Sequence, residues 1–416
     1  MIGLVDGNNF FVSCERIFDK SLEGKPVAVL SSNDGCVIAR SNEIKALGIA
    51  MGTPYFKLKP DIKRLGIVLR SGNHELYADI SRRVMSVLAE FVPDVEQYSI
   101  DEAFIWPAYD KNFDWQSFGT KIRTTILKWI GVPCGIGFAP TKTLAKIANH
   151  IGKKSASGVY VMPTDIKSVI EKLPVDEVWG IGRNLTDKLR RRGIYTAWQL
   201  ATYGDEKLHK AFSIGVARTA MELRGFQCYE EEDVNALSQS ISYSRCYGEP
   251  VVDFNDIAES VSYYIGRAAE KLRAEGQRAS GVNVYSVYYP EYKPYRLDGG
   301  VLDIVVPFPT STDDTIEMLK AIKPHLPRLF KDGRRYKKSG VVFWGLENGA
   351  LQLDMFNPKM NATNSKLFEA VDKLNARFGK RALVSLSEGL DKKWLAKRNM
   401  ASPNYTTDWN DIPIVR

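Results

Sequence analysis

The sequence predicts an α+β protein of several domains, and three features of the chain support this prediction. Short apolar strand-like segments alternate with amphipathic helical segments before Pro163. From there to about Glu232 the pattern is helical and rich in Lys and Arg. Residues 238–346 follow the order strand, helix, strand, strand, helix, strand, which is the split βαβ pattern of a compact sheet with helices on one face. Interleaved strands and helices form α/β or α+β layers, and 416 residues correspond to about two to four domains.

The composition indicates a reduced chain that stays outside membranes. The five cysteines are odd in number and lack CxxC spacing, and the four histidines are well separated, so neither disulfides nor a zinc site is expected. No basic leader precedes a long apolar stretch, and no stretch approaches membrane-spanning length. We therefore expect a cytoplasmic protein. The formal charge of +8 and the isoelectric point of about 9.0 indicate nucleic-acid binding only if the cations cluster.

The region before Pro163 contains strand and helix candidates in a clear order. IGLVD is a short apolar run that ends on Asp6, and KPVAVLSS is a second strand candidate. Between about residues 41 and 70, basic residues alternate with turn signals, which predicts a small, loop-rich subdomain. VEQYSI and DEAFIW are strand-like pieces with Asp101 and Glu102 at their junction, and VPCGIGFA is a further strand. Apolar residues at helical spacing predict helices over residues 76–91, 115–130 and 141–151.

Three acidic residues are candidates for holding catalytic metal ions. Phosphoryl transfer from a nucleoside triphosphate needs charge neutralised at the attacking oxygen, the phosphorus and the leaving group, which two metal ions do together. Mg²⁺ prefers oxygen ligands, so Asp6, Asp101 and Glu102 supply a suitable set. Adjacent residues of a regular strand point to opposite faces, but a hairpin tip between the two strands would let Asp101 and Glu102 reach one site. Taken alone, the Asp-Glu pair is far more typical of a solvated turn than of a metal site, and the surrounding residues are what favour the metal site.

Motifs along the whole chain resemble a known family. YSIDEAF, the N-terminal VDGNNFF and GIGFAPTKTLAKIAN resemble the Y-family of translesion DNA polymerases. SNDGCVIARSNEIKALGI and HELYADISRRVM are similar to the UmuC-type catalytic subunit of bacterial DNA polymerase V and its plasmid and mobile-element relatives. The resemblance implies an error-prone, template-directed DNA polymerase of the SOS response, which extends primers past damaged bases by two-metal-ion nucleotidyl transfer without proofreading.

The resemblance also implies a right-hand-like division of the chain. The implied parts are a palm (1–17 and 76–163), small fingers (18–75), a helical thumb with a helix-hairpin-helix (164–234), a split-βαβ little finger (238–346) and a C-terminal clamp- and partner-binding tail (347–416). The residues after Glu347 are rich in turn signals, with one short helix near residues 366–378.

By the same resemblance, specific residues hold the metals and the nucleotide sugar. Asp6, Asp101 and Glu102, with the backbone carbonyl of Gly7, hold two Mg²⁺ ions, for which Mn²⁺ can substitute. Phe11 lies where the family places the aromatic steric gate, which clashes with a ribose 2′-hydroxyl and so selects deoxynucleotides. Phe10 is a second candidate for the nucleotide site, and for Phe10 a core aromatic remains the alternative.

The expected grip on the triphosphate departs from the wider family. The family's Tyr and Arg of the fingers correspond to Asn42 and Lys45, and Lys neutralises a phosphate without forking it as Arg does. Arg40 or Arg70 could compensate. The family's palm Lys corresponds to Lys153, with Lys154 as the alternative register.

Basic residues in two regions are the predicted contacts to duplex DNA. In WGIGRNLTDKLRRRGI a Gly-x-Gly turn exposes backbone N–H groups at a helix start, which suits a DNA phosphate, although an ordinary helix-helix turn remains the alternative for the turn alone. The predicted contacts in this motif are Gly180, Gly182, Arg183, Lys188, Arg190, Arg191 and Arg192. Those in the little finger are Arg245, Arg278, Arg334 and Arg335, the last two within a basic run that could equally be a hairpin tip in solvent.

The C-terminal region carries the predicted protein contacts. The clamp-binding peptide is Gln352, Leu353, Asp354, Met355 and Phe356, which resembles the Gln-Leu-x-Leu-Phe-like motif for the β sliding clamp. The resemblance further implies a UmuD'-type dimer and a RecA-type recombinase filament as partners, primer-template DNA and dNTP as substrates, and a bacterial, nucleoid-associated location. The alternatives are a non-catalytic DNA-binding scaffold and another two-metal enzyme such as a nuclease or nucleotide cyclase; the carboxylates argue against the first and the gate, thumb and clamp motifs against the second.

Overall fold

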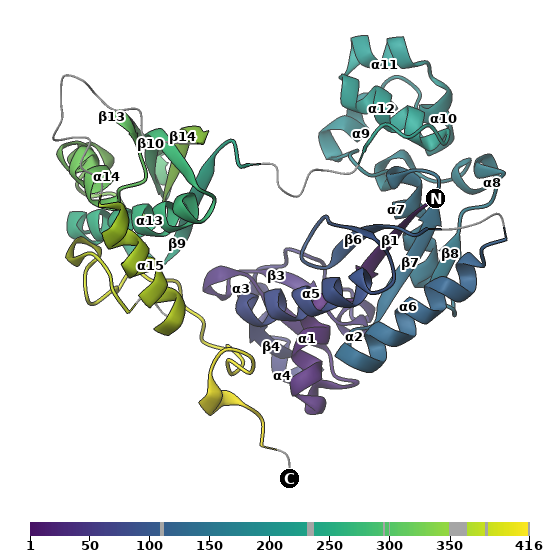
Figure 1. The fold of residues 1–416 in the computed structure, drawn as a ribbon, viewed down its shortest axis with the longest axis horizontal. Coiled ribbons are helices and arrows are strands. Elements are labelled where there is room, and N and C mark those ends of the chain that lie inside the picture. Colours follow the sequence, from purple (N-terminus) through teal and green to yellow (C-terminus); the bar gives the residue numbers. More distant parts are fainter. Residues whose placement is uncertain are drawn as a thin grey trace. The chain divides into compact units, whose positions relative to one another are not determined.

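The computed structural model describes residues 1–108, 112–230, 237–293, 296–298, 300–348, 364–378 and 382–414. The chain divides into two compact units: unit 1 is Met1–Val234 with Asn399–Arg416, and unit 2 is Asn235–Arg398. Both units combine helices and sheets, which confirms the predicted α+β class (Figure 1). None of the described helices has both the length and the apolar character needed to cross a membrane.

A five-stranded sheet forms the centre of unit 1. Its order is β5 (Asp94–Gln97), β6 (Glu102–Trp106), β1 (Ile2–Gly7), β7 (Cys134–Ala139) and β8 (Val159–Val161). The central strand β1 is antiparallel to both of its neighbours. Helices α5 (His74–Ala89) and α6 (Trp115–Ile130) cover one face, and α7 (Lys142–Lys154) covers the other. Val5 therefore packs with α5 and α6, whereas Leu4 packs with α7.

A smaller sheet lies beside helix α1 (Phe10–Phe18). Its order is β3 (Val37–Arg40), β2 (Val27–Leu30) and β4 (Val68–Ser71), and it carries the short helices α2 (Asn42–Ala46), α3 (Tyr55–Leu58) and α4 (Ile62–Leu65). This subdomain has its own core around Leu30, Ile44 and Leu69. The region that the sequence predicted as loop-rich therefore contains one strand and three short helices, because apolar residues among its turns fill that core.

The helical stretch predicted after Pro163 is confirmed. It comprises α8 (Ile166–Ile170), the 3₁₀ turn η3 (Val175–Glu177), α9 (Arg183–Arg190), α10 (Ala197–Thr202), α11 (Asp205–Ala211) and α12 (Ile214–Leu223). Buried Glu222 joins this stretch to α7, because its carboxylate accepts from the backbone N–H groups of Thr143 (2.8 Å), Cys228 and Tyr229 (both 3.1 Å). The side chain of Thr141 donates to the Glu222 carbonyl at 3.0 Å.

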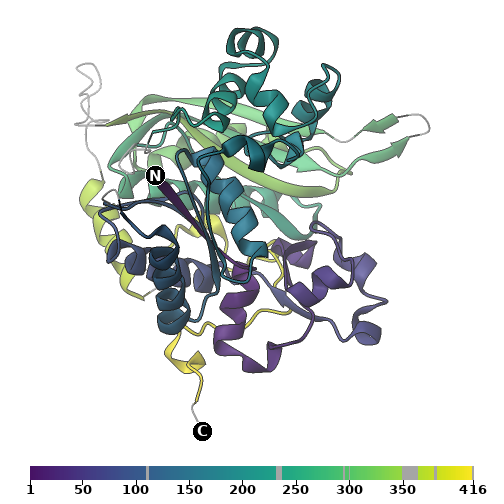
Figure 2. The ribbon, with the colours of Figure 1, turned by 90° about the vertical axis from the view of Figure 1, so that its right-hand side faces the viewer.

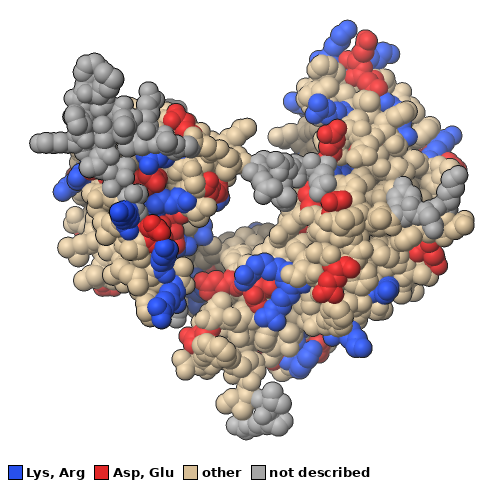
Figure 3. Space-filling view, in the orientation of Figure 1, with Lys and Arg blue, Asp and Glu red and all other residues tan. Residues whose placement is uncertain are grey.

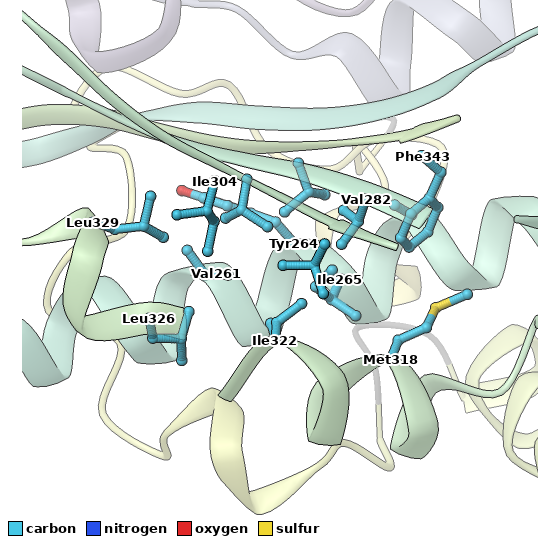
Figure 4. Close-up of a cluster of buried hydrophobic side chains, with 14 of the residues drawn as sticks. Val261, Tyr264, Ile265, Val282, Ile304, Met318, Ile322, Leu326, Leu329 and Phe343 are labelled. Atoms are coloured by element: carbon cyan, nitrogen blue, oxygen red, sulfur yellow. The ribbon is translucent and has the colours of Figure 1, made fainter. Parts of the chain in front are cut away.

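Unit 2 has the split βαβ arrangement that the sequence predicted. Its elements are β9 (Ile241–Val251), α13 (Phe254–Ala274), β10 (Gln277–Tyr288), β13 (Val301–Thr312), α14 (Thr315–Ile322) and β14 (Tyr336–Asn348). The sheet order is β13-β10-β14-β9, so β14 separates β9 from β10. Val261, Ile265 and Met318 belong to the core between the sheet and the helices (Figure 4). A hairpin of β11 (Glu291–Lys293) and β12 (Arg296–Asp298) projects from the ends of β10 and β13 (Figure 2).

The C-terminal region is divided between the two units. The predicted short helix is α15 (Ser365–Phe378), and Arg273 of α13 pairs with its Asp372 at 2.6 Å. Trp394 is 2% exposed and lies within the core cluster of unit 2. The residues after Arg398 instead belong to unit 1. A region that the sequence set apart as one tail therefore packs in two places.

Candidate active site

Two of the three predicted metal-binding carboxylates meet at one end of the central sheet. Asp6 and Glu102 are direct partners in the β1–β6 register, and opposite residues of antiparallel strands have Cβ atoms about 4.5–5.5 Å apart. The Gly7 N–H donates to the Asp101 carbonyl at 2.9 Å, which continues the pairing past Asp6. By strand alternation Asp6 shares the face of Leu4, so both carboxylates lie on the α7 side of the sheet.

Two lysines of α7 pair with these carboxylates. Lys153 Nζ lies 2.6 Å from Asp6 Oδ1, and Lys146 Nζ lies 2.9 Å from Glu102 Oε2. Of the two predicted registers, Lys153 is the one that the structure places beside Asp6. Helix α7 can lie close to the sheet because Gly137 of β7 has no side chain. A Cβ at this position would clash with the backbone nitrogen of Asn149, so only glycine fits.

Burial and negative charge perturb the carboxylate at the centre of the site. Burial raises the pKa of Asp6 to about 7, Lys153 opposes the rise, and Glu102 and Asp101 add to it. Like charges in one site disfavour ionisation, and added positive charge favours it. The site is therefore one where bound cations would stabilise the ionised carboxylates.

Asp101 is oriented differently from the other two acids. Its Oδ1 accepts from Ser99 Oγ at 2.7 Å. Strand β6 begins at Glu102, so the regular alternation starts there and sends the two side chains different ways. Within the described ranges, no group of three or more His, Cys, Asp or Glu side chains is arranged to hold a metal ion. The hairpin thus brings all three acids to one sheet end, but their side chains do not converge in this structure.

Phe11 lies in a cluster of aromatic rings beside the site. Its ring stacks on Tyr77 at a centroid distance of 4.3 Å and an interplanar angle of 14°, and it meets His74 edge-on at 5.7 Å. Phe11 is half-buried, whereas Phe10 is 4% exposed and belongs to the core of unit 1. The core position that the sequence left open for Phe10 is the one observed.

The predicted triphosphate residues of the fingers meet through an additional side chain. Asn9 Oδ1 accepts from Lys45 Nζ at 2.6 Å, and Asn9 Nδ2 donates to Asn42 Oδ1 at 3.0 Å. The pKa of Lys45 is lowered, first by burial and then by the positive charges of Arg40 and Lys153. These cations therefore lie close enough to repel one another, which favours binding of an anion among them.

The two arginines considered for the triphosphate site differ in their contacts. Arg40 Nη1 donates to the Ile49 carbonyl at 2.8 Å, and its charge is felt at Lys45. Arg70 pairs with Asp19 at 2.8 Å. The structure thus gives Arg40 a place in the cation cluster and engages Arg70 elsewhere.

The predicted DNA-binding turn of unit 1 is open. Gly180 has φ +83°, a conformation that favours glycine, and a Cβ at Gly182 would meet no atom within 4 Å. Arg183, Lys188 and Arg191 on or just after α9 are exposed. Arg190 pairs with Asp176 at 2.8 Å, and the Arg192 guanidinium lies 4.9 Å from the centroid of the Phe212 ring.

The basic residues predicted in unit 2 are held by aromatic or acidic neighbours. Three of them lie over tyrosine rings: the guanidinium of Arg245 is 4.6 Å from the centroid of Tyr243, that of Arg334 is 5.0 Å from Tyr288, and that of Arg335 is 5.9 Å from Tyr289. The fourth, Arg278, pairs with Asp313 at 3.5 Å. Figure 3 shows acidic and basic side chains interspersed over the face in view, without a large patch of one sign. The predicted clamp peptide, residues 352–356, lies outside the described residues.

The sequence interpretation missed Lys146 and Asn9. Lys146 and Lys153 are seven residues apart, which places them on one face of a helix. That spacing in TKTLAKIANHIGKK was the signal that could have identified Lys146. Asn9 has φ 48°, the left-handed conformation, in the turn between β1 and α1, and local sequence gives no comparable signal for its contacts with α2.

Sequence comparisons cover most of the chain. The impB/mucB/samB family matches residues 5–150, the IMS family HHH motif matches residues 163–194, and the impB/mucB/samB C-terminal domain matches residues 238–355. Residues 365–415 match a domain of unknown function. The protein UmuC of Salmonella typhimurium strain LT2 is 41% identical over 422 residues, which cover 99% of both chains. The protein ImpB of Salmonella typhimurium is 39% identical over 427 residues, covering 100% of both.

Solved structures show the same fold. A Y-family DNA polymerase chimera of Dbh and Dpo4 has a TM-score of 0.67 at 22% identity, covering 84% of this chain and 100% of that chain. An insertion ternary complex of Dbh DNA polymerase has a TM-score of 0.55 over the same shares. The fold and the full-length match to UmuC together place the chain among the DNA-directed DNA polymerases of the translesion class. Within that class, the chain belongs to the impB/mucB/samB family, the UmuC-type branch of the Y-family.

Proposed function

We propose that this polymerase transfers nucleotides with two Mg²⁺ ions, replaceable by Mn²⁺, held by Asp6, Asp101, Glu102 and the Gly7 carbonyl. The observation that carries the proposal is that Asp6 and Glu102 lie directly opposite each other, and that burial, Glu102 and Asp101 together raise the pKa of Asp6 to about 7. Half-buried carboxylates at such spacing are costly to ionise unless cations neutralise them, and oxygen donors are those that Mg²⁺ prefers.

The residues present fit this ion. All four proposed donors are oxygen atoms, and the ammonium groups of Lys153 and Lys146 already supply positive charge beside Asp6 and Glu102. Asp101 joins the set when its carboxylate leaves the side-chain hydroxyl of Ser99, from which it accepts at 2.7 Å. When bound, the ions supply charge neutralisation at the attacking and leaving oxygens.

The neighbouring residues have separate roles in this proposal. Lys153, released from Asp6, and Lys45 neutralise the triphosphate, with Arg40 and Asn42 beside them. The ring of Phe11, fixed by its stacking on Tyr77, excludes a ribose 2′-hydroxyl. Because Lys45 is a point charge where the wider family has a forked Arg, the hold on the triphosphate depends more on charge than on geometry.

We also assign the duplex grip and the partners. The open turn at Gly180 and Gly182 with the cations of α9, and the basic side chains of unit 2, hold primer-template DNA through its phosphates, which positions a duplex without reading its sequence. In this assignment unit 1 comprises palm, fingers and thumb, and unit 2 comprises the little finger. The relationship to UmuC supports a UmuD'-type dimer, a RecA-type filament and the β sliding clamp as partners at the bacterial nucleoid.

Primer extension tests the site assignment. Wild type and the Asp101→Ala/Glu102→Ala variant are supplied with clamp and accessory proteins on templates with and without an abasic position, in Mg²⁺ or Mn²⁺. We expect extension by wild type in both metals and none by the variant. The exposed Asp94 of β5 provides the control, since Asp94→Asn removes one negative charge from the same sheet.

Two outcomes would contradict different parts of the proposal. Equal extension by wild type and the double variant would remove Asp101 and Glu102 from the site. Extension by wild type without any divalent cation would remove the metal requirement. Direct Mn²⁺ binding, measured by the loss of free-ion paramagnetic resonance signal, separates a binding defect from a misfolded chain.

A further inference from the structure

The C-terminal segment Asn399–Tyr405 is bound against unit 1 close to the start of α5. Ser71 and Met400 exchange two hydrogen bonds of 2.9 Å, one from each backbone N–H, and the Asn399 N–H donates to Asp34 Oδ2 at 2.9 Å. Ser71 and Ala401 form a parallel bridge, so the segment extends the edge of the small sheet at β4. Tyr405 stacks on Phe18 of α1 at 4.7 Å and 7°. These contacts anchor both ends of the segment.

Ser402 is the residue through which the segment reaches the interior. Its side chain is 7% exposed, and its hydroxyl donates to Glu15 Oε1 at 3.1 Å. The same hydroxyl accepts from Asn73 Nδ2 at 3.0 Å, and Asn73 Nδ2 also donates to the Pro403 carbonyl at 3.2 Å. Asn73 is the N-cap of α5, since its Oδ1 accepts from the Leu76 N–H at 3.3 Å. One buried asparagine thus joins the C-terminal segment to the first turn of α5.

The first turn of α5 carries both rings that surround Phe11. His74 meets Phe11 edge-on, and Tyr77 lies stacked beneath it. Tyr77 is fully buried, and its hydroxyl donates to Glu15 Oε1 at 2.7 Å. Ser402 and Tyr77 therefore donate to the same oxygen of Glu15. A continuous line of contacts runs from Ser402 through Glu15 and Tyr77 to Phe11.

We propose that the segment Asn399–Tyr405 is a positioning element of the sugar-selecting site, acting through Ser402 on Tyr77 and Phe11. The proposal rests on the assignment of Phe11 as the steric gate. A steric gate discriminates by distance, and a functional side chain must be held within about 0.5 Å of its working place by the groups packed around it. Phe11 is half-buried, and its ring stacks on Tyr77. The position of Tyr77 therefore determines how far the Phe11 ring extends toward a bound sugar. The segment belongs to the part of the chain matched by a domain of unknown function, to which the proposal gives a role.

The test measures sugar selection in the full-length chain with its accessory proteins. Ser402→Ala removes the hydroxyl that contacts Glu15 and Asn73, and Ser402→Thr retains a hydroxyl. The matched control is Ser387→Ala, which removes an exposed hydroxyl elsewhere in the C-terminal region. For each variant the measured quantity is the efficiency of ribonucleotide insertion divided by that of deoxynucleotide insertion, with KM and kcat determined separately for each sugar.

We expect Ser402→Ala to raise this ratio by about 5-fold, the factor that corresponds to one ordinary hydrogen bond. Ser402→Thr and Ser387→Ala should keep the wild-type ratio. Tyr77→Phe removes the other donor to Glu15 without touching the segment, and it should raise the ratio in the same direction. In a Phe11→Ala background Ser402→Ala should add nothing further, because contacting residues that act through one another are not additive.

The outcomes separate the two assignments. If Phe11→Ala raises the ratio but Ser402→Ala and Tyr77→Phe leave it unchanged, the positioning role is wrong and the segment only stabilises unit 1. A lower melting temperature of Ser402→Ala with an unchanged ratio supports that same conclusion. If Phe11→Ala itself leaves the ratio unchanged, the gate assignment is wrong and the positioning proposal is overturned with it. An additive effect of the two substitutions would show that Ser402 acts by another route.

Discussion

The two sheets of the molecule differ in how they are covered. The five-stranded sheet of unit 1 has helices on both faces, and β7 is buried along its whole length. In the described part of unit 2, the helices α13 and α14 pack on one face of the sheet, and exposed and buried residues alternate along β13. Val305 of that strand is 60% exposed, while its neighbours Ile304 and Val306 are 3% and 4% exposed.

The difference in cover separates two kinds of function. A sheet packed on both faces holds the side chains at its strand ends in place, and the carboxylates lie at such an end. On the uncovered face of the sheet in unit 2, aromatic side chains lie over glycines. The Trp344 ring occupies the space where a Cβ of Gly281 would be, and the Tyr285 hydroxyl would lie 2.6 Å from a Cβ of Gly340. We therefore expect activity to depend on few residues of unit 1, whereas contacts made by unit 2 are shared among many.

The largest expected effect comes from removing a carboxylate of the doubly covered sheet. Asp6→Asn should reduce primer extension by roughly 10³-fold or more, because the ions contribute several kcal/mol of charge stabilisation. Asp303→Asn on the exposed side of β13 provides the matched change in unit 2 and should have little effect. Single-turnover rates of both variants are the measurement. A comparable reduction in the single-turnover rates of both variants would contradict the proposal that catalysis depends on the sheet of unit 1 and not on that of unit 2.

The second effect concerns an aromatic ring. Phe11→Ala should raise ribonucleotide insertion relative to deoxynucleotide insertion by roughly 10²-fold, the scale on which a shaped pocket discriminates single groups. Tyr285→Ala removes a ring from the open face of unit 2 and should leave the sugar ratio unchanged. Parallel insertion assays with the two kinds of triphosphate decide this, and a raised ratio for Tyr285→Ala alone would place sugar selection outside the covered sheet.

Local patterns in the sequence predicted most elements of both sheets. Helix α6 has the predicted bounds Trp115–Ile130, and the split βαβ order of unit 2 is as predicted, because periods of 3.6 and 2 residues are properties of short segments. The pairing of Asp6 with Glu102 follows from the same local patterns, since Asp6 lies next to the end of β1 and Glu102 begins β6.

Contacts between distant segments were not predictable in this way. Ser402 and Glu15 are 387 positions apart, and no periodicity links the C-terminal segment to α1. The orientation of Asp101 depends on a hydroxyl two residues away and on where β6 begins, which residue pattern alone does not fix. Asn9 joins Asn42 and Lys45 only because its left-handed turn aims it at α2.

The third prediction concerns the grip on DNA, where single changes should matter less. Lys188→Ala with Arg191→Ala should weaken primer-template binding several-fold for all sequences. The slope of log affinity against log salt should fall by about 0.9 for each phosphate that the variant no longer neutralises. Lys121→Ala with Lys128→Ala removes the same charge from the exposed side of α6 and is the control. Binding titrations over a range of salt measure both. An unchanged slope for the α9 pair would remove that helix from the interface.

The smallest expected effect concerns Glu15, a carboxylate within the covered unit that lies outside the proposed metal site. Burial raises the pKa of Glu15, against the opposing effects of hydrogen bonds from Tyr77 and Ser402 and of the charge of Arg70; Asp19 adds slightly to the rise.

A raised folded-state pKa means that this group's contribution to stability is fully present below its unfolded pKa and is lost as pH rises through the folded value. Gln does not titrate, so wild type should lose stability relative to Glu15→Gln between acidic and alkaline pH. The unfolding midpoint of unit 1, measured at several pH values with Glu23→Gln as the exposed control, tests this. A difference that is constant with pH would mean that folding does not shift the pKa of Glu15. A difference that grows in the opposite direction would mean that the folded state favours the charged form of Glu15.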